Sequence, residues 1–328
     1  MYQQMKKNIA IVAGGDQSEV VVSLKSAKGI YSFMDKEKYN VYIVTIIGTE
    51  WNLEVNDAKY PVDKNDFSAV IDGLKIKFDY AYITIHGTPG EDGKLQGYFE
   101  LMKIPYSSCG VLASALTYNK FTCNTYLKNF GIPVAKSLRL RSVDDYTDKE
   151  IVDAVGLPCF VKPNDGGSSF GVTKVKTIEQ VKPAVKKAFA EGSETVIESF
   201  MQGTEITCGI YKAGGKTTVF PITEVVSENE FFDYDAKYKG QVKEITPARI
   251  SEETAAVVRK QTERIYNVLD AHGIIRVDYI ISADGTVNLL EVNTTPGMTP
   301  TSFIPQQVAA AGLEMKDVLS NIIENQFK

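Results

Sequence analysis

The chain has 328 residues, enough for two or three domains, and 44% of them are hydrophobic and 23% charged, as is typical of soluble globular proteins. Its net charge of −5 argues against a general nucleic-acid binder, although a locally basic pocket for an anionic ligand remains compatible with it. Four dispersed cysteines without a C-x-x-C pair, and only two histidines, argue against a zinc site.

The hydrophobic runs are all short. No apolar stretch approaches the about 18 residues that a membrane-spanning helix needs. The run near the N-terminus, Ile9–Ala13, is also too short for a signal peptide. We therefore expect a cytoplasmic protein with reduced thiols and no membrane association.

Strands and helices alternate in the first third of the chain. Residues 8–15 (NIAIVAGG) form a short apolar run that ends in two glycines, as is typical of a buried parallel strand. A helical pattern follows over residues 23–35, and strand-like runs cover residues 39–47 and 78–87. This alternation predicts an α/β domain with a parallel sheet over residues 1–109.

The rest of the chain divides into two further units. A helical stretch over residues 110–131 opens the second, followed by strands over 157–163, 171–177 and 194–200 and a helix over 177–192. This pattern predicts a small α+β domain over residues 110–197. The third unit, residues 198–328, has strands over 205–226, 273–282 and 286–293 and helices over 251–273 and 305–327. Its irregular, aromatic-rich stretch over 227–250 suits a functional loop.

Two short motifs point to chemistry that their surroundings do not support. Gly167–Gly171 fits the G-x-S-x-G pattern of a serine hydrolase, with Ser169 as nucleophile, but such an elbow needs a helix after the serine. A strand-like segment follows instead, which favours a glycine-rich loop over phosphates. GIYKAGGKTT has one residue too many for a phosphate-binding P-loop and lies between strands, so we expect a hairpin turn at Ala213–Lys216.

Oxygen-bearing side chains gather at the end of the predicted 273–293 hairpin. Asp278 lies on its first strand, and Glu291 and Asn293 share one face of its second. Such a set suits Mg²⁺, which bridges carboxylates to substrate phosphates, although a solvated strand end explains the residues equally simply. Arg276 shares the face of Asp278 and would place a positive charge beside the metal.

Two lysines extend this electrostatic pattern. Lys162 follows an apolar strand and directly precedes the glycine-rich loop, and Lys120 lies in the helical stretch before it. Either lysine alone is typical of a protein surface. Together with the loop and the magnesium set they favour a phosphate clamp.

The ordered motifs resemble those of the D-alanine–D-alanine ligases of the ATP-grasp superfamily over nearly the full chain. They are GGDQSEVVVSL, HGTPGEDGKLQG, KPNDGGSSFG, FFDYDAKY and RVDYI…LLEVNTTPGMTPTSF. The resemblance implies an N-terminal α/β domain and two ATP-grasp domains with ATP between their sheets. It also implies a cytoplasmic homodimer that phosphorylates one D-alanine, joins it to a second and thereby supplies peptidoglycan synthesis.

The resemblance assigns roles position by position. Glu19 would hold the ammonium of the first D-alanine, His86 would lie near that substrate, and Arg276 and the backbone of Gly297 would stabilise the oxyanion. The remaining matches are the phosphate lysines Lys120 and Lys162, the adenine and ribose carboxylates Glu198 and Glu205, the magnesium (or manganese) ligands Asp278, Glu291 and Asn293, and Ser302 and Phe303 for the second carboxylate.

FFDYDAKY matches the family's mobile ω-loop, in which Lys237 and Tyr238 face the substrates. Tyr238 would join Ser168 and Glu19 in a hydrogen-bonded triad. This loop favours D-alanine over D-lactate as the second substrate. The chain departs from the family pattern at Val20 and Val21, at Asn119, and at Asp165–Gly166, but no named catalytic group is lost.

Other functions remain as alternatives. An ATP-grasp ligase could join other carboxylates and amines, and Ser169 could serve an esterase. An ATP-binding regulatory module would need no oxyanion or metal residues, and this sequence keeps them.

Overall fold

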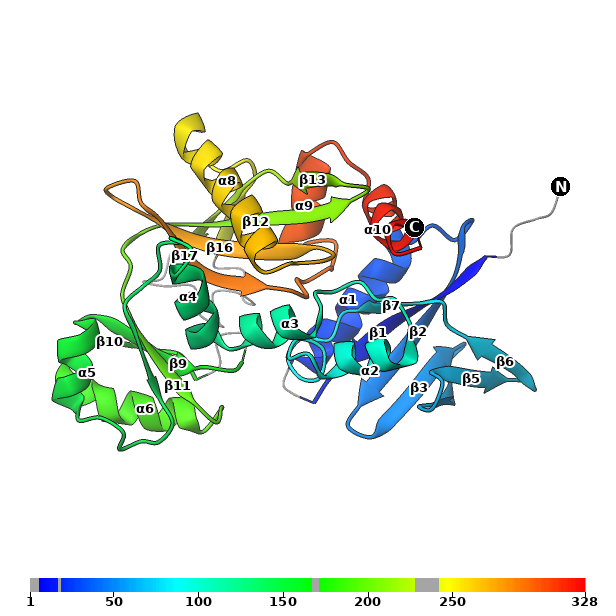
Figure 1. Ribbon diagram of the computed structural model, residues 1–328, viewed down its shortest axis with the longest axis horizontal. Coiled ribbons are helices and arrows are strands. Elements are labelled where there is room, and N and C mark those ends of the chain that lie inside the picture. Colours follow the sequence, from blue (N-terminus) through cyan, green and yellow to red (C-terminus); the bar gives the residue numbers. More distant parts are fainter. Residues whose placement is uncertain (1–5, 17–18, 167–170, 228–241, 328) are drawn as a thin grey trace.

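The computed structural model describes residues 6–16, 19–166, 171–227 and 242–327. Figure 1 shows three lobes, each built around its own β-sheet, with the first at the lower right, the central one at the lower left and the last above them. In the described part of the chain, no helix combines the length and apolar character needed to cross a bilayer.

The first lobe contains a seven-stranded sheet in the order β6-β5-β4-β3-β2-β1-β7. The parallel sheet predicted from sequence is its β2-β1-β7 part, and an antiparallel meander extends it. Two-residue turns at Asn56–Asp57 and Asp72–Gly73, with all four φ angles positive, form two of the meander's hairpins, β3–β4 and β5–β6. The elements are β1 (Lys7–Gly14), α1 (Val20–Phe33), β2 (Tyr39–Ile47), β3 (Glu50–Val55), β4 (Ala58–Asp63), β5 (Ser68–Ile71), β6 (Leu74–Lys77), β7 (Tyr80–Ile83) and α2 (Lys94–Met102).

The central lobe contains an antiparallel sheet in the order β10-β9-β11-β8. The single helix predicted over residues 110–131 is two helices, because Asn119 takes an extended conformation and its side chain caps the second helix by accepting from the Thr122 amide at 2.9 Å. The elements from α3 to β11 are α3 (Val111–Tyr118), α4 (Lys120–Lys128), β8 (Ser137–Leu140), α5 (Asp148–Val155), β9 (Cys159–Pro163), β10 (Thr173–Val175), the 3₁₀ helix η1 (Ile178–Gln180), α6 (Val181–Phe189) and β11 (Thr195–Ser199). The buried apolar residues of α3 and α4 pack into the hydrophobic cluster of the last lobe.

The last lobe contains an antiparallel sheet in the order β15-β14-β12-β16-β17, with β13 paired to one end of β12. Gly214 and Gly215 both have positive φ and form the predicted hairpin turn. The predicted final helix is interrupted near Gly312, whose φ is +69°. The elements are β12 (Gly203–Ala213), β13 (Lys216–Val219), β14 (Thr223–Ser227), β15 (Val242–Ile245), α8 (Glu252–Val268), β16 (Ile275–Ser282), β17 (Val287–Asn293), α9 (Phe303–Ala310) and α10 (Met315–Asn325).

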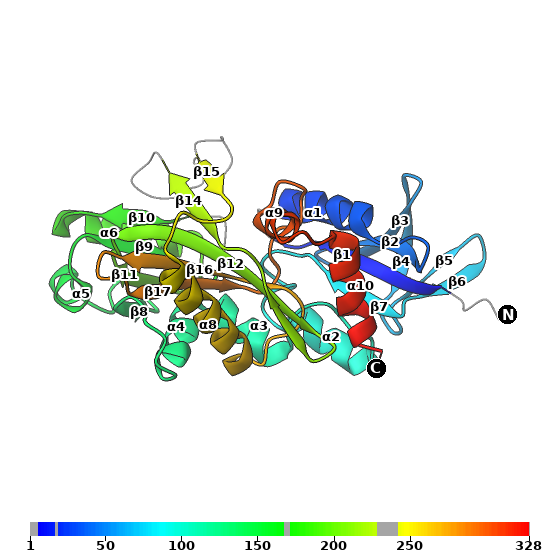
Figure 2. The ribbon, with the colours of Figure 1, turned by 90° about the horizontal axis from the view of Figure 1, so that it is seen from above.

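The first and last lobes share one hydrophobic core. Apolar residues of α9 and α10, such as Ile304 and Leu319, pack in one cluster with β1 and α1. Figure 2 shows α9 beside α1 and α10 beside β1. The Tyr39 hydroxyl donates to Glu324 Oε1 at 2.8 Å and ties α10 to β2. The end of the chain therefore helps to fix the first lobe against the last.

Candidate active site

The β16–β17 hairpin brings the predicted magnesium set together. Asp278 pairs across the strands with Glu291, and Arg276 pairs with Asn293, so the four side chains share one face. Asn293 Nδ2 lies 3.0 Å from Asp278 Oδ2 and 3.5 Å from Glu291 Oε1. Within the described residues, no group of three or more His, Cys, Asp and Glu side chains is arranged to hold a metal ion. The predicted set instead offers two carboxylates and one amide, oxygen donors that fit Mg²⁺.

Asp278 is the most strongly held member of this set. Arg276 donates to its two oxygens at 2.9 and 2.8 Å, and the Thr207 hydroxyl on the neighbouring strand donates to Oδ1 at 2.5 Å. Although burial lowers the pKa of Arg276, the charge and hydrogen bonds of Asp278 and the charge of Glu291 raise it above its ordinary value. Arg276 therefore stays a fixed positive charge, with its guanidinium 5.3 Å from the Phe303 ring centroid.

The base of the glycine-rich loop carries a buried ion pair. Lys162 on β9 and Glu198 on the adjacent strand β11 are 8% and 3% exposed, and Lys162 Nζ lies 2.6 Å from Glu198 Oε2. Asn124 Nδ2 on α4 donates to Glu198 Oε1 at 3.1 Å. The two residues predicted to hold a phosphate and the adenine edge thus contact each other directly.

Lys120 reaches the same loop from the start of α4. Its backbone amide donates to Asn164 O at 3.1 Å, and its ammonium donates to Gly166 O. Asn119 forms an isolated β-bridge with Asp165. The break in the predicted helix therefore presents Lys120 to the loop, which joins β9 to β10 as strand–loop–strand. That geometry lacks the helix that a nucleophile elbow requires.

Glu205 lies on the same sheet face as the hairpin cluster. It is two residues before Thr207 on β12 and pairs with Ile280, which in turn is two residues after Asp278. Glu205 therefore shares a sheet face with the predicted metal ligand Asp278, and its role at a ribose stays a prediction.

The first lobe contributes residues at the carboxyl ends of its parallel strands. Glu19 directly precedes α1 in the loop after β1, and His86 lies in the loop after β7. Ligands of parallel sheets usually bind at this edge. Glu19 and His86 therefore lie where a small substrate is expected.

The turn after β17 faces these loops. Gly297 lies close to Ser302, because a Cβ built on it would be 3.0 Å from the Ser302 hydroxyl. That hydroxyl accepts from the Thr299 amide at 3.1 Å, and Ser302 directly precedes α9. Phe303, the first residue of α9, is the residue that Arg276 contacts. Gly297 and the predicted carboxylate positions thus belong to one turn and the helix that follows it, whereas Arg276 reaches them from β16.

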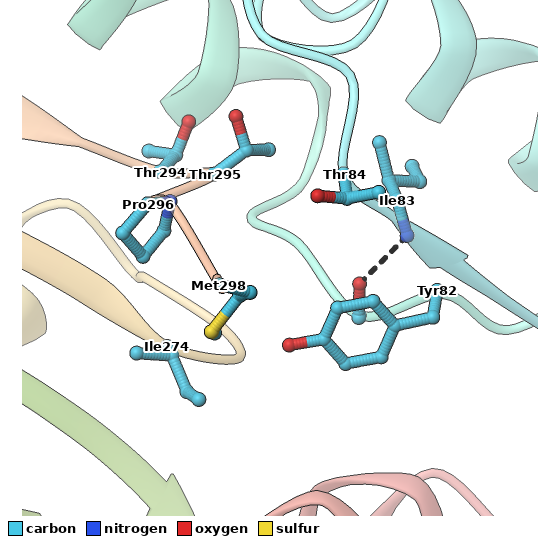
Figure 3. Close-up of a pocket in the computed structure, with 9 residues that line it drawn as sticks. Tyr82, Ile83, Thr84, Ile274, Thr294, Thr295, Pro296 and Met298 are labelled. Carbon is cyan, nitrogen blue, oxygen red and sulfur yellow. Dashed lines mark hydrogen bonds between the residues drawn. The ribbon is translucent and has the colours of Figure 1, made fainter. Parts of the chain in front are cut away.

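A small cavity lies between this turn and the end of β7 (Figure 3). Two of its lining residues are hydrogen-bonded to each other, since the Ile83 amide donates to the Ser107 hydroxyl at 2.9 Å. The lining residues are Tyr82, Ile83, Thr84, Ser107, Ile274, Thr294, Thr295, Pro296 and Met298. The cavity lies between the first and last lobes.

Comparison with known proteins decides the family. A sequence-family model described as D-ala D-ala ligase N-terminus matches residues 8–109, and one described as D-ala D-ala ligase C-terminus matches residues 126–324. The chain is 65% identical to a D-alanine–D-alanine ligase of Bacteroides fragilis over 98% of this chain and all of that protein. The chain belongs to the D-alanine–D-alanine ligase family.

Solved structures agree with this assignment. The VanG D-Ala:D-Ser ligase of Enterococcus faecalis superposes with a TM-score of 0.87 at 30% identity, covering 98% of this chain and all of that one. The D-alanine–D-alanine ligase of Bacillus anthracis complexed with ATP gives 0.76 at 29% identity, covering 98% and 97%. The ATP-grasp architecture and the ATP-dependent ligase activity predicted from sequence are therefore confirmed.

Sequence reasoning gave no role to one carboxylate of this ligase. Glu91, in the motif HGTPGEDG, accepts from the Gly87 amide and from the Thr295 hydroxyl, both at 2.7 Å. The pKa of Glu91 is raised to about 7, mainly by burial and also by the charge of Glu19, while the two hydrogen bonds and the charge of Lys120 oppose this rise. In the sequence, the position of Glu91 in a glycine-rich loop after a predicted parallel strand could have marked it as a functional residue.

Three predicted residues lie outside the described part of the ligase. Ser168 belongs to the glycine-rich loop, and Lys237 and Tyr238 belong to the predicted ω-loop. Ser169, the hydrolase candidate, lies outside it as well. The hydrogen-bonded triad of Glu19, Ser168 and Tyr238 stays a prediction.

Proposed function

We propose that the chain phosphorylates the carboxylate of one D-alanine with ATP and joins the resulting D-alanyl phosphate to a second D-alanine. The observation that carries this proposal is the contact between the first and last lobes at Glu91, which accepts from the Thr295 hydroxyl at 2.7 Å. The charges of Glu19 in the first lobe and of Lys120 at the start of α4 act on the pKa of Glu91, and the charge of Glu91 acts in turn on the pKa of Arg276 in the last lobe. We infer that the residues predicted for the first substrate, the phosphates and the oxyanion belong to one site.

In the first step, the D-alanine carboxylate oxygen attacks the γ-phosphorus of ATP and ADP leaves. We propose that Glu19 holds the ammonium of this substrate, with His86 beside it, while Lys120 and Lys162 bind the phosphates. Lys162 would then exchange part of its contact with Glu198 for a phosphate oxygen. Fixed positive charges lower the barrier because charge spreads over the phosphoryl oxygens during transfer.

The divalent metal has a matching set of donors. We propose that Asp278, Glu291 and Asn293 hold Mg²⁺, with Mn²⁺ as a possible substitute. When bound, the metal would neutralise charge on the phosphates. As placed, Asn293 turns its amide nitrogen toward both carboxylates, so it would have to present Oδ1 to act as a ligand.

In the second step, the amine of the second D-alanine attacks the acyl phosphate carbonyl and phosphate leaves, while the ammonium proton passes to solvent or phosphate. We propose that Arg276 and the Gly297 amide stabilise the negative oxygen that develops. Ser302 and the start of α9 at Phe303 would receive the second carboxylate, since helix N-termini favour anions.

The lid and the assembly are further parts of the proposal. The ω-loop with Lys237 and Tyr238 would exclude water from the acyl phosphate, which water destroys. We propose three domains, over residues 1–109, 110–197 and 198–328, with α10 packing back against the first sheet. We also propose that the protein is a cytoplasmic homodimer that supplies peptidoglycan synthesis. We expect it to have no nucleic-acid or membrane partner. Light scattering of the purified protein measures the assembly state.

The deciding experiment incubates the protein with ATP, Mg²⁺ and D-alanine and measures both phosphate and dipeptide. Parallel reactions with D-serine or D-lactate test the second substrate, and reactions without metal or with Mn²⁺ test the cofactor. ATP turnover with another acid but not with D-alanine would reject the substrate assignment. Ester hydrolysis without ATP that is abolished by Ser169→Ala would favour the esterase instead.

A further inference from the structure

Gln307 is a fully buried amide on a helix face that is otherwise apolar. It lies on α9, one turn after Phe303, and is 0% exposed. Its buried neighbours on the helix include Ile304 and Val308. A buried amide in such a place is costly unless all its hydrogen-bonding groups find partners.

The amide of Gln307 is fully used. Its Oε1 accepts from the Gly209 amide at 3.0 Å. Its Nε2 donates to Thr207 O and to the Thr223 hydroxyl, both at 3.1 Å. All three partners lie on β12 and β14, beneath α9.

These partners are available because β12 changes neighbours at this point. It pairs with β14 as far as Thr207 and with β13 from Ile210 onward. Between these two pairings, the Gln307 side-chain amide takes the place of a neighbouring strand. It hydrogen-bonds the carbonyl of Thr207 and the N–H of Gly209, two residues on, as a residue of a paired strand would. Gly209 leaves room for it, because a Cβ there would be 2.7 Å from Gln307 Oε1 and 2.5 Å from Ile304 Cδ1.

Two of the residues bonded to Gln307, Thr207 and Thr223, make further hydrogen bonds through their hydroxyl groups. The Thr207 hydroxyl donates to Asp278 Oδ1 at 2.5 Å, so one residue contacts both Gln307 and the metal-set carboxylate. The Thr223 hydroxyl lies 2.6 Å from the Thr246 hydroxyl, directly after β15. Gln307 thus joins α9 to the hairpin cluster through Thr207 and to the β14–β15 pair through Thr223.

We propose that Gln307 is a positioning residue, which holds the start of α9, and with it the second-substrate position at Ser302 and Phe303, in register with Asp278. The proposal rests on the ligase function above. The acyl carbon and the incoming amine are held by different elements, and only their relative position decides whether the amine can attack. Gln307 ties these elements together through Thr207.

The test replaces Gln307 by methionine, which keeps the length of the side chain and removes its amide. Initial rates over a wide range of D-alanine concentrations, fitted with separate constants for the two substrate molecules, should show the KM of the amine-donating D-alanine raised about tenfold. The KM values of ATP and of the first D-alanine should change less than about twofold, because their proposed binding residues lie on other elements.

Gln261→Met is the matched control. Gln261 is a partly buried glutamine on α8 whose Nε2 donates to Val287 O at 3.0 Å, so the variant removes a comparable bond in the same lobe. Its KM values should equal those of the unmodified protein within about twofold. Thermal unfolding of both variants shows how much of any effect is lost stability.

Substitutions of Thr207 test its bond to Asp278 separately from its bond to Gln307. Thr207→Val removes the hydroxyl bonded to Asp278 but keeps the carbonyl bonded to Gln307, so kcat should fall about tenfold with the second KM unchanged. Thr207→Ser should restore kcat. A rise in the second KM without a fall in kcat would contradict the proposed coupling.

Each outcome decides the proposal. A folded Gln307→Met protein with an unchanged second KM, or with all constants raised alike, would overturn it. If this variant does not fold, Thr223→Val removes one of the three partners, and a selectively raised second KM supports the proposal whereas an unchanged one overturns it. Absence of dipeptide from the unmodified protein would reject the ligase function itself, whereas dipeptide with an unchanged second KM would reject only this inference.

Discussion

Arg276 holds both carboxylate oxygens of Asp278, with Nε 2.9 Å from Oδ1 and Nη2 2.8 Å from Oδ2. The two residues lie two apart on β16 and therefore share a face. The Thr207 hydroxyl donates a further hydrogen bond to Oδ1, and the Asn293 side chain donates one to Oδ2. The carboxylate is thus held in a single orientation by a planar fork, as only arginine can provide.

Arg276→Ala should lower kcat by about two to three orders of magnitude, the usual effect of removing an oxyanion donor. Arg276→Lys keeps the charge but loses the fork and should recover only part of the rate. The control is Arg259→Ala, which removes an arginine paired with the exposed Glu252 on α8. Steady-state rates of dipeptide formation measure all three, and a near-normal rate for Arg276→Ala would remove it from the mechanism.

Asp278→Asn should weaken divalent-metal binding by at least about tenfold, the loss that outer-shell partners alone can cause. Calorimetric titration with Mn²⁺, in the presence of a non-hydrolysable ATP analogue, measures this directly without turnover. Asp284→Asn changes the exposed turn of the same hairpin and should bind the metal normally. Equal affinities in the two variants would place the metal elsewhere.

Glu91→Gln should change how stability depends on pH. Because the folded pKa of Glu91 is raised from 4.5 to about 7, the folded protein keeps this proton in a range where the unfolded chain has released it. Stability from this group therefore falls as pH rises from about 4.5 to 7. The neutral amide escapes this loss, so the difference in Tm between variant and unmodified protein should move in favour of the variant from pH 5 to pH 8. A difference that stays constant would contradict the raised pKa.

Gly29→Ala should destabilise the protein by about 1–3 kcal/mol, as overpacking does. A Cβ on Gly29 in α1 would lie 2.3 Å from the Met298 carbonyl, so α1 or the turn containing Gly297 would have to move. Since Glu19 directly precedes α1, kcat/KM should also fall. Gly97→Ala in α2 is the matched control, because its Cβ meets nothing nearer than 3.8 Å and should be neutral or slightly stabilising. Chemical denaturation and rate assays compare the two, and equal stabilities would refute a tight contact at Gly29.

Local patterns alone predicted several parts of this protein. The strand–loop–strand around Lys162, the turn at Gly214–Gly215 and the hairpin that carries Asp278 and Glu291 all follow from periodicity and turn residues within short segments. Because a strand alternates its side chains, the shared face of Arg276 and Asp278 also follows from their spacing of two residues.

The tertiary structure decided what depends on distant partners. The helical pattern around Asn119 gave no sign of its break, where Asn119 forms a β-bridge with Asp165 at the start of the glycine-rich loop. The bond between Glu91 and Thr295 joins residues 204 positions apart. Local sequence specifies local conformation because nearby atoms determine the backbone torsions, whereas the partners of a buried polar group depend on which surfaces the whole chain brings together.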